Sequence, residues 1–152
     1  MAYWLFKTEP DAFSLDDLKN APKQTTLWEG VRNYQARNFM RDDVKVGDSV
    51  MIYHSSCKHV GVAGIAEVTK EAYPDPTQFD FSSDYYDAKA TSDKPRWVVV
   101  EVTYQSHLKK LISLKDIKAN DNITEIALKK GGRLSIMPVT KNDWDEIIKM
   151  TQ

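Results

Sequence analysis

The stretch from Arg96 to Tyr104 is the clearest strand signal in the chain, and it constrains the fold most. Successive side chains of a strand point to opposite faces of a sheet. One face would hold Val98, Val100 and Val102, and the other Trp97, Val99, Glu101 and Thr103. Valine is β-branched and suits a pleated, buried surface, and here it falls on both faces. The pattern therefore predicts a sheet at the centre of the fold.

Four further segments have the alternation or the β-branched runs that are typical of strands. They are residues 2–7, 49–54, 60–73 and 134–139. In the first of them, Tyr3 and Leu5 would face one side of the sheet while Trp4 and Phe6 face the other. Pro74-Asp75-Pro76 would end the longest segment in a turn.

Short helices are expected between these strands, because residues that favour the helix N-cap stand ahead of several segments. Ser14, Asn33, Ser113 and Thr140 are the candidate caps. The first two precede helices predicted at 14–20 and 34–42, and a further helix is predicted at about 124–130. Strands interspersed with short helices predict an α+β fold with a closed or nearly closed mixed sheet.

Composition narrows the class of protein. The chain has 152 residues, a net charge of −1 and 41% hydrophobic residues, which fits one soluble domain over residues 1–152. The near-neutral charge argues against a protein that coats DNA by phosphate neutralisation alone. Cys57 is the only cysteine, and no signal or membrane-spanning segment is recognised. A cytoplasmic bacterial protein, or a nuclear one in a eukaryote, is expected, as a monomer.

The segment from Trp28 to Arg41 gives the main indication of function. It contains three arginines, three aromatic residues and three carboxamides, with one acid. Aromatic faces stack on bases, guanidinium groups pair with phosphates, and carboxamides hydrogen-bond base edges. An ordinary core segment does not need this mixture, so the segment predicts a nucleobase or nucleic-acid pocket.

Individual candidates follow from these chemistries. Trp28, Tyr34 and Trp97 are the predicted stacking walls, and core packing is the alternative for all three. Asn33, Gln35 and Ser55 are the predicted contacts to the base edge. For Asn33 the alternative is a helix cap, and for Ser55 a turn hydroxyl. The predicted phosphate contacts are Lys7, Arg32, Arg37, Arg41 and Arg96, with solvated surface charge as the alternative.

Several longer stretches, in order and nearly end to end, resemble the EVE-domain family. They include residues 3–10, 28–41, 64–68, 72–80, 85–87, 133–135 and 138–140, whereas residues 136–137 depart from the family pattern. The resemblance implies a PUA-like mixed β-barrel surrounded by short helices. It also implies a module that reads a modified nucleobase in DNA or RNA.

Other functions remain open at this point. An enzyme acting on a nucleobase or RNA would use Lys7, Glu9 or Cys57 as catalyst, and a small-ligand or protein-interaction domain could use the same cleft. His54, Cys57 and His59 match no zinc spacing, so neither a metal nor a cofactor is predicted. No phosphate-loop, dinucleotide-binding or hydrolase motif occurs in the sequence. The prediction is a non-catalytic reader with an aromatic pocket.

Overall fold

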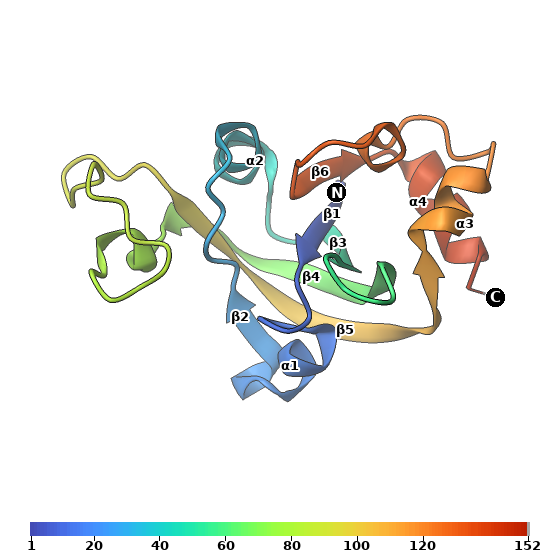
Figure 1. The fold of residues 1–152 in the computed structure, drawn as a ribbon, viewed down its shortest axis with the longest axis horizontal. Helices are drawn as coiled ribbons and strands as arrows, with labels where there is room; N and C mark the ends of the chain where they lie inside the picture. The colour runs from blue at the N-terminus through green and yellow to red at the C-terminus, as the bar shows by residue number, and fades with distance from the viewer. Residues whose placement is uncertain (152) are drawn as a thin grey trace.

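The computed structural model describes residues 1–151 and shows one mixed sheet of six strands, with short helices on both faces (Figure 1). The strand order is β2-β5-β4-β3-β1-β6. The strands are β1 (Tyr3–Thr8), β2 (Thr25–Leu27), β3 (Ser49–His54), β4 (Gly61–Pro74), β5 (Val98–Ser113) and β6 (Ile136–Val139). β1 and β3 are parallel, and every other pair is antiparallel.

The helices are short. The α-helices are α1 (Leu15–Asn20), α2 (Tyr34–Asn38), α3 (Leu114–Ala119) and α4 (Lys141–Lys149). Single turns of other helix types are η1 (Pro22–Gln24), η2 (Phe39–Asp43), η3 (Pro76–Phe79) and η4 (Ala127–Lys130). Ser14, Asn33, Ser113 and Thr140 each accept a backbone hydrogen bond at a helix start, so the four predicted caps are confirmed.

The sheet separates two hydrophobic cores. Successive side chains of β1 point to opposite faces of the sheet and therefore belong to different cores. Trp4 and Phe6 belong to the core under α1, α2 and η2, whereas Leu5 belongs to the core under α3 and α4. Residues of β3 alternate in the same way, with Ile52 on the first side and Met51 on the second. Since both faces are covered, the central strands are apolar on both sides, as the sequence pattern predicted.

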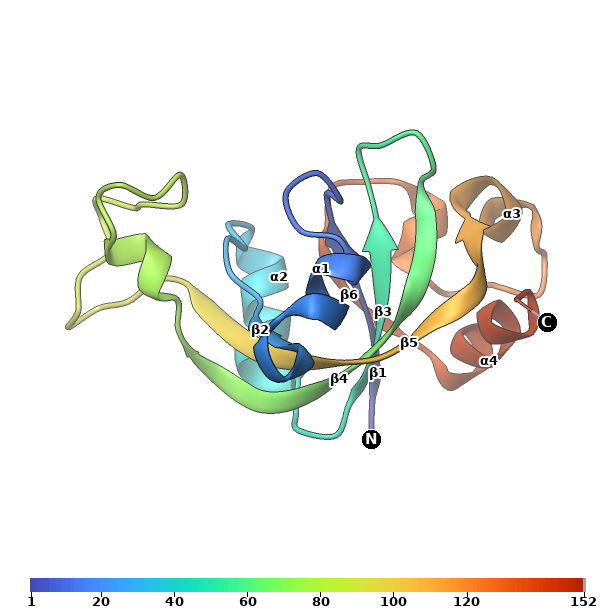
Figure 2. The same ribbon diagram turned by 90° about the horizontal axis from the view of Figure 1, so that it is seen from below.

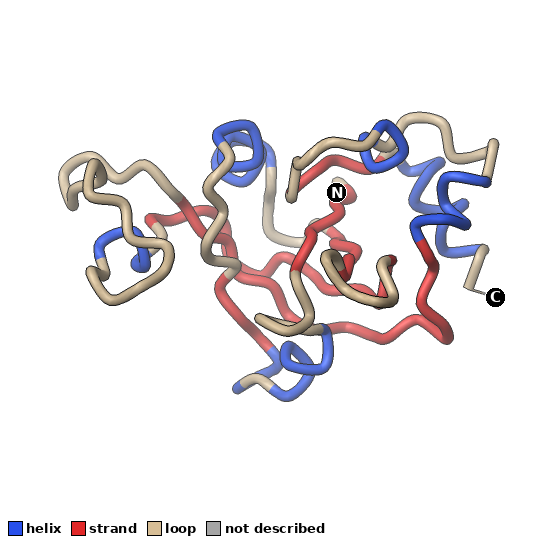
Figure 3. The backbone as a smooth tube through the Cα atoms, in the orientation of Figure 1, coloured by secondary structure: helices blue, strands red, loops and turns tan. Residues whose placement is uncertain are grey.

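The expected α+β class with a mixed sheet is confirmed, but the sheet does not close into a barrel. β2 pairs only with β5, and β6 pairs only with β1, so these two strands are the free edges of an open sheet. They contain three and four residues, and no hydrogen-bonded pairing joins them to each other. Helices cover the faces instead (Figure 3).

Some element boundaries differ from those predicted. The helix predicted at 34–42 divides into α2 and the π-helical turn η2. The strand predicted to end at Tyr104 continues as β5 to Ser113, paired with β4 through several register shifts. Between β4 and β5 the segment 75–97 extends away from the sheet, as Figure 2 shows. No helix within residues 1–151 is long and apolar enough to cross a membrane.

Candidate nucleobase pocket

The segment from Trp28 to Asn33 leaves the sheet at β2 and crosses toward α2 in an extended conformation (Figure 1). The backbone N–H of Trp28 still donates to the Val100 carbonyl, at 2.8 Å. Gly30 then adopts φ +80°, and a Cβ atom there would lie 2.6 Å from the ring of Tyr85. Glycine is required here both by the left-handed backbone and by the close approach of Tyr85.

The buried carboxylate of Asp75 holds the segment from Trp28 to Asn33 in place. Asp75 is completely buried and accepts hydrogen bonds from Gly30 N at 3.0 Å, Arg32 Nη1 at 3.1 Å and Thr77 N at 2.8 Å. Arg32 is further held by the Tyr85 carbonyl, which lies 2.7 Å from Nη2. A buried charge needs such partners, and their number makes this junction rigid.

A cavity of about 460 Å³ lies beside the crossing segment. Two stretches, residues 7–9 with 12–13 and residues 26–33, make most of its wall, and Tyr85 and Ser135 complete it. The backbone N–H of Lys7 donates to the Ser135 carbonyl at 2.9 Å, which joins two sides of the wall. This volume lies within the range of small-ligand sites, and the lining combines aromatic rings with polar groups.

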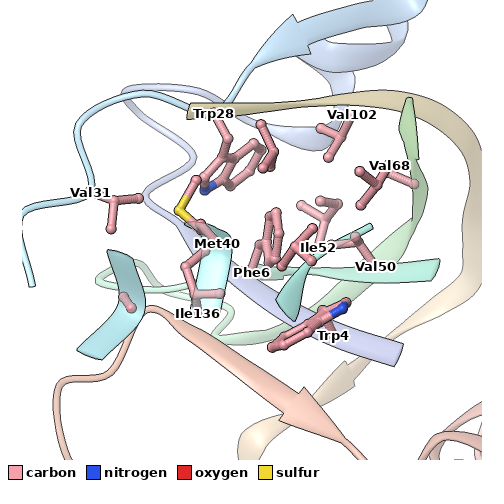
Figure 4. Close-up of a cluster of buried hydrophobic side chains, with 14 of the residues drawn as sticks. Trp4, Phe6, Trp28, Val31, Met40, Val50, Ile52, Val68, Val102 and Ile136 are labelled. Atoms are coloured by element: carbon pink, nitrogen blue, oxygen red, sulfur yellow. The ribbon is translucent and has the colours of Figure 1, made fainter. Parts of the chain in front are cut away.

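Trp28 belongs both to the cavity wall and to the core. Its ring centroid lies 5.5 Å from that of Phe6 and 6.5 Å from that of Phe13, and only 7% of the residue is exposed. Figure 4 shows the indole beside Phe6, with its nitrogen edge on the side of Val31 and away from Val102. The two interpretations of Trp28 from the sequence, core residue and pocket wall, therefore apply together.

Asn33 also serves two purposes. Its Oδ1 accepts from Ala36 N at 3.0 Å, which caps α2, and the residue lines the cavity. Within residues 1–151, no hydrogen bond occupies its Nδ2. The cap therefore uses one end of the carboxamide and leaves the donor end for a ligand.

Three charged side chains line the cavity without an ion pair or a side-chain hydrogen bond among the described residues: Lys7, Glu9 and Glu29. Burial lowers the pKa of Lys7 below its ordinary value. Burial, followed by the nearby Asp75 carboxylate, raises the pKa of Glu29, while Arg32 acts in the opposite direction. Both shifts have desolvation as the main cause, as expected for groups lining a recess.

Trp97 lies outside this cavity, so the sandwich of Trp28 and Trp97 predicted from the sequence is not formed by its walls. Trp97 is 5% exposed, donates from Nε1 to Asp87 at 2.8 Å, and stacks with Tyr34 at a centroid distance of 4.8 Å. Arg37 lies over the outer ring, 4.7 Å from the centroid of Tyr34, and donates to the Arg96 carbonyl. Two residues of α2 and two that pack against it form a cluster, which we call the Tyr34 ridge: Tyr34, Arg37, Arg96 and Trp97.

The remaining predicted residues are placed elsewhere. Arg41 is exposed and pairs with its neighbour Asp42 at 2.8 Å. Gln35 is exposed on α2 and does not line the cavity. Ser55 is half-buried and lies behind the wall, where its N–H donates to the Thr8 carbonyl at 2.9 Å.

Several lining residues were not expected from the sequence. In the sequence, Glu29 is only the single acid of its segment, and Phe13, Tyr85 and Ser135 lie far from that segment in the chain. Ser135 and Tyr85 lie within or beside stretches that resembled the EVE-domain family, and this was the one available signal. Within residues 1–151, no group of three or more histidine, cysteine, aspartate or glutamate residues is placed to hold a metal ion.

Known proteins are similar in sequence to this chain over nearly its whole length. The family model described as the EVE domain matches residues 2–150. Human thymocyte nuclear protein 1 is 39% identical over 168 residues, an alignment that covers 99% of this chain and 74% of the human protein.

Solved structures show the same similarity. A Pseudomonas putida protein is 46% identical with a TM-score of 0.95, and the match covers 99% of this chain and 100% of that one. Human THYN1, solved in complex with 5-methylcytosine containing DNA, is 38% identical with a TM-score of 0.96, and the match covers 100% of this chain and 98% of that one.

Proposed function

This chain belongs to the EVE domain family, and from that premise we propose that it is a non-catalytic nucleic-acid-binding module that reads a modified base. One observation carries the proposal. A structure of the same fold, with a TM-score of 0.96, holds DNA that contains 5-methylcytosine. The cavity beside Trp28 supports it, because it combines aromatic rings with polar groups that have no protein partner.

In the proposed complex, one base leaves the stack and enters the cavity. Extrusion of a base costs a few kcal/mol, and stacking on aromatic side chains returns roughly 1–3 kcal/mol per base. Phe13, Trp28 and Tyr85 are the aromatic residues that line the cavity. An added methyl group on the base would gain apolar contact with such a wall, which favours the modified base over the unmodified one.

The cationic residues have unequal parts in this proposal. Lys7 lines the cavity and is the proposed phosphate contact nearest the base. Arg37, Arg41 and Arg96 remain candidate phosphate contacts outside it. Arg32 is left with a positioning role, since its guanidinium donates to Asp75, Thr77 and Tyr85.

Gln35 and Ser55 also remain candidate base contacts, outside the cavity wall. We propose that the module acts as a monomer in a reducing compartment, with Cys57 as a free thiol. Mass analysis of a modified oligonucleotide after long incubation checks that it is not an enzyme. An unchanged oligonucleotide is expected.

The test of function is fluorescence anisotropy with matched oligonucleotides, in DNA and in RNA, that differ only in one modified base. Tighter binding of an oligonucleotide carrying 5-methylcytosine than of its cytosine control is expected. Equal affinities for all modified and unmodified pairs, in both kinds of nucleic acid, would overturn the proposal.

A further inference from the structure

Residues 28–33 contribute to the cavity wall three polar side-chain groups that have no hydrogen-bond partner among residues 1–151. They are the indole Nε1–H of Trp28, the Nδ2 amide of Asn33 and the carboxylate of Glu29. The first two are donors and the third is an acceptor when ionised. They come from six consecutive residues of one segment, and all three residues line the cavity. Trp28 is buried, whereas Glu29 and Asn33 are exposed to solvent.

The Nε1–H of Trp28 has no acceptor within the described chain, unlike those of Trp4 and Trp97. Trp144, buried in the other core, also lacks an acceptor but does not line the cavity. Trp4 donates from Nε1 to Asp48 at 3.0 Å, and Trp97 donates to Asp87 at 2.8 Å. Trp28 is nearly as buried as these residues, but its N–H has no acceptor within the described chain. The one fully buried, unpartnered side-chain polar atom among residues 1–151 is Oγ1 of Thr151, so Nε1 of Trp28 keeps contact with solvent. A buried indole normally finds a partner, and here the cavity offers the place for one.

The set of two donors and one acceptor is complementary to the pairing edge of cytosine. That edge presents two acceptors, O2 and N3, and one donor, the 4-amino group. Purines do not match in the same way, because guanine presents two donors and one acceptor, and adenine one of each. Thymine has the same numbers as cytosine, but its donor is at N3 and an acceptor stands at position 4, so the position of the acceptor in the protein must separate the two pyrimidines. Carboxylates also accept hydrogen bonds from the amino group of cytosine in other protein–DNA complexes.

We propose that Glu29 reads the 4-amino group of a flipped cytosine base, and that Trp28 and Asn33 donate to its two ring acceptors. This inference rests on the proposed function and adds the residue that selects the base class. The methyl group at position 5 is then read by apolar contact, and the amino group at position 4 by Glu29.

The surroundings of Glu29 suit this role. Glu29 is exposed at the cavity wall, so its carboxylate is accessible to a base in the cavity. Partial burial and then the nearby Asp75 carboxylate raise its pKa. Asp75 itself is not available for a base, because Gly30, Arg32 and Thr77 occupy both of its oxygens. Glu9 also lines the cavity, and it provides a matched control of the same charge.

Thymine is the decisive competitor, because it shares the 5-methyl group and O2 with 5-methylcytosine but carries an oxygen at position 4. Single-stranded oligonucleotides with one 5-methylcytosine, cytosine or thymine at the same position remove differences in base pairing. We expect the wild-type protein to prefer 5-methylcytosine to thymine. Glu29→Gln should reduce that ratio about tenfold or more, since its amide also donates to the thymine oxygen.

Controls separate this inference from the proposed function. Glu9→Gln should leave the ratio unchanged. Trp28→Phe, which keeps an aromatic ring and removes the N–H, should weaken binding of 5-methylcytosine, with thermal melting used to show that the variant is folded.

If the wild-type protein distinguishes no modified base from its unmodified control in the earlier assay, the proposed function fails. If it distinguishes other modified bases but not 5-methylcytosine from cytosine, this inference alone fails. If it does distinguish 5-methylcytosine, the inference is overturned by any of three results: no preference over thymine, an unchanged ratio in Glu29→Gln, or an equal loss in Glu9→Gln.

Discussion

The two halves of the segment from Trp28 to Arg41 have a similar composition but use their side chains differently. In residues 28–33, the Trp28 N–H, the Glu29 carboxylate and the Asn33 amide have no protein partner and line the cavity. In residues 34–41, the Tyr34 ring stacks with Trp97, and Arg37 donates to Asn38 and to the Arg96 carbonyl.

The difference between residues 28–33 and residues 34–41 shows how a binding surface can be recognised in a chain that contains many residues able to bind nucleic acid. Aromatic rings and guanidinium groups stabilise protein structure as readily as they bind nucleic acid. Polar groups that a rigid backbone directs into a recess, without a partner, are the more specific sign of a ligand. Arg32 marks the boundary, since it lines the cavity but donates to Asp75. The following predictions test this division of the segment.

The largest effect is expected at Trp28. Trp28→Ala removes a large side chain from the core around Phe6 and Phe13 and should cost ~3–5 kcal/mol of the free energy of unfolding. Binding of the modified oligonucleotide should fall as well. Thermal or denaturant unfolding measures the first, and anisotropy below the transition measures the second.

Tyr34→Ala is the control from the second half of the segment. Half of Tyr34 is exposed, so the loss of stability should be clearly smaller than at Trp28. A larger loss of stability at Tyr34 than at Trp28 would contradict the assignment of the core.

The next effect concerns Arg32. Arg32→Ala leaves the completely buried Asp75 carboxylate without its cation. It should lower the free energy of unfolding by about 2–3 kcal/mol, less than the ~3–5 kcal/mol for a fully buried pair, because Arg32 is partly exposed. Denaturant titration measures this change.

Arg41→Ala is the matched control, because Arg41 pairs with Asp42 at the surface. Its unfolding transition should be indistinguishable from that of the wild-type protein. Equal destabilisation by the two substitutions would show that the Arg32–Asp75 pair does not hold the crossing segment.

Asn33 should show a smaller change in stability. Asn33→Ala removes the cap of α2 and should cost about 1 kcal/mol. It also removes the donor in the cavity, so affinity should fall beyond what partial unfolding explains. Asn38→Ala, in the same helix but away from the cavity wall, should leave affinity unchanged. An Asn33→Ala protein that binds as tightly as the wild type would restrict Asn33 to its capping role.

The smallest effect is expected in the salt dependence of binding. Lys7→Ala should lower the slope of log affinity against log salt by ~0.7–0.9, the amount for one lost phosphate contact. Lys115→Ala, on α3 across the sheet from Trp28, should leave the slope unchanged. Arg37→Ala tests the Tyr34 ridge by the same measurement. If it lowers the slope as much as Lys7→Ala does, the ridge also contacts a phosphate of the nucleic acid.

The sequence contained enough to predict the strands, the helix caps and the two-sided apolar pattern. In β1, for example, Trp4 and Phe6 lie in one core and Leu5 in the other, as the alternation required. The four caps were predictable because each depends on groups three residues apart. Such features are local, so intrinsic preferences of the chain determine them.

Long-range contacts decided the rest. The closure of the sheet depended on how its edge strands end, and the continuation of β5 to Ser113 depended on its pairing with β4. Arg32 could be read as a phosphate contact until Asp75, 43 residues away, was seen to hold it. The sequence thus determined which chemical groups the segment carries. Only the tertiary structure decided which of these groups form hydrogen bonds or ion pairs within the protein and which remain available to a ligand. The reason is that the partners come from distant parts of the chain.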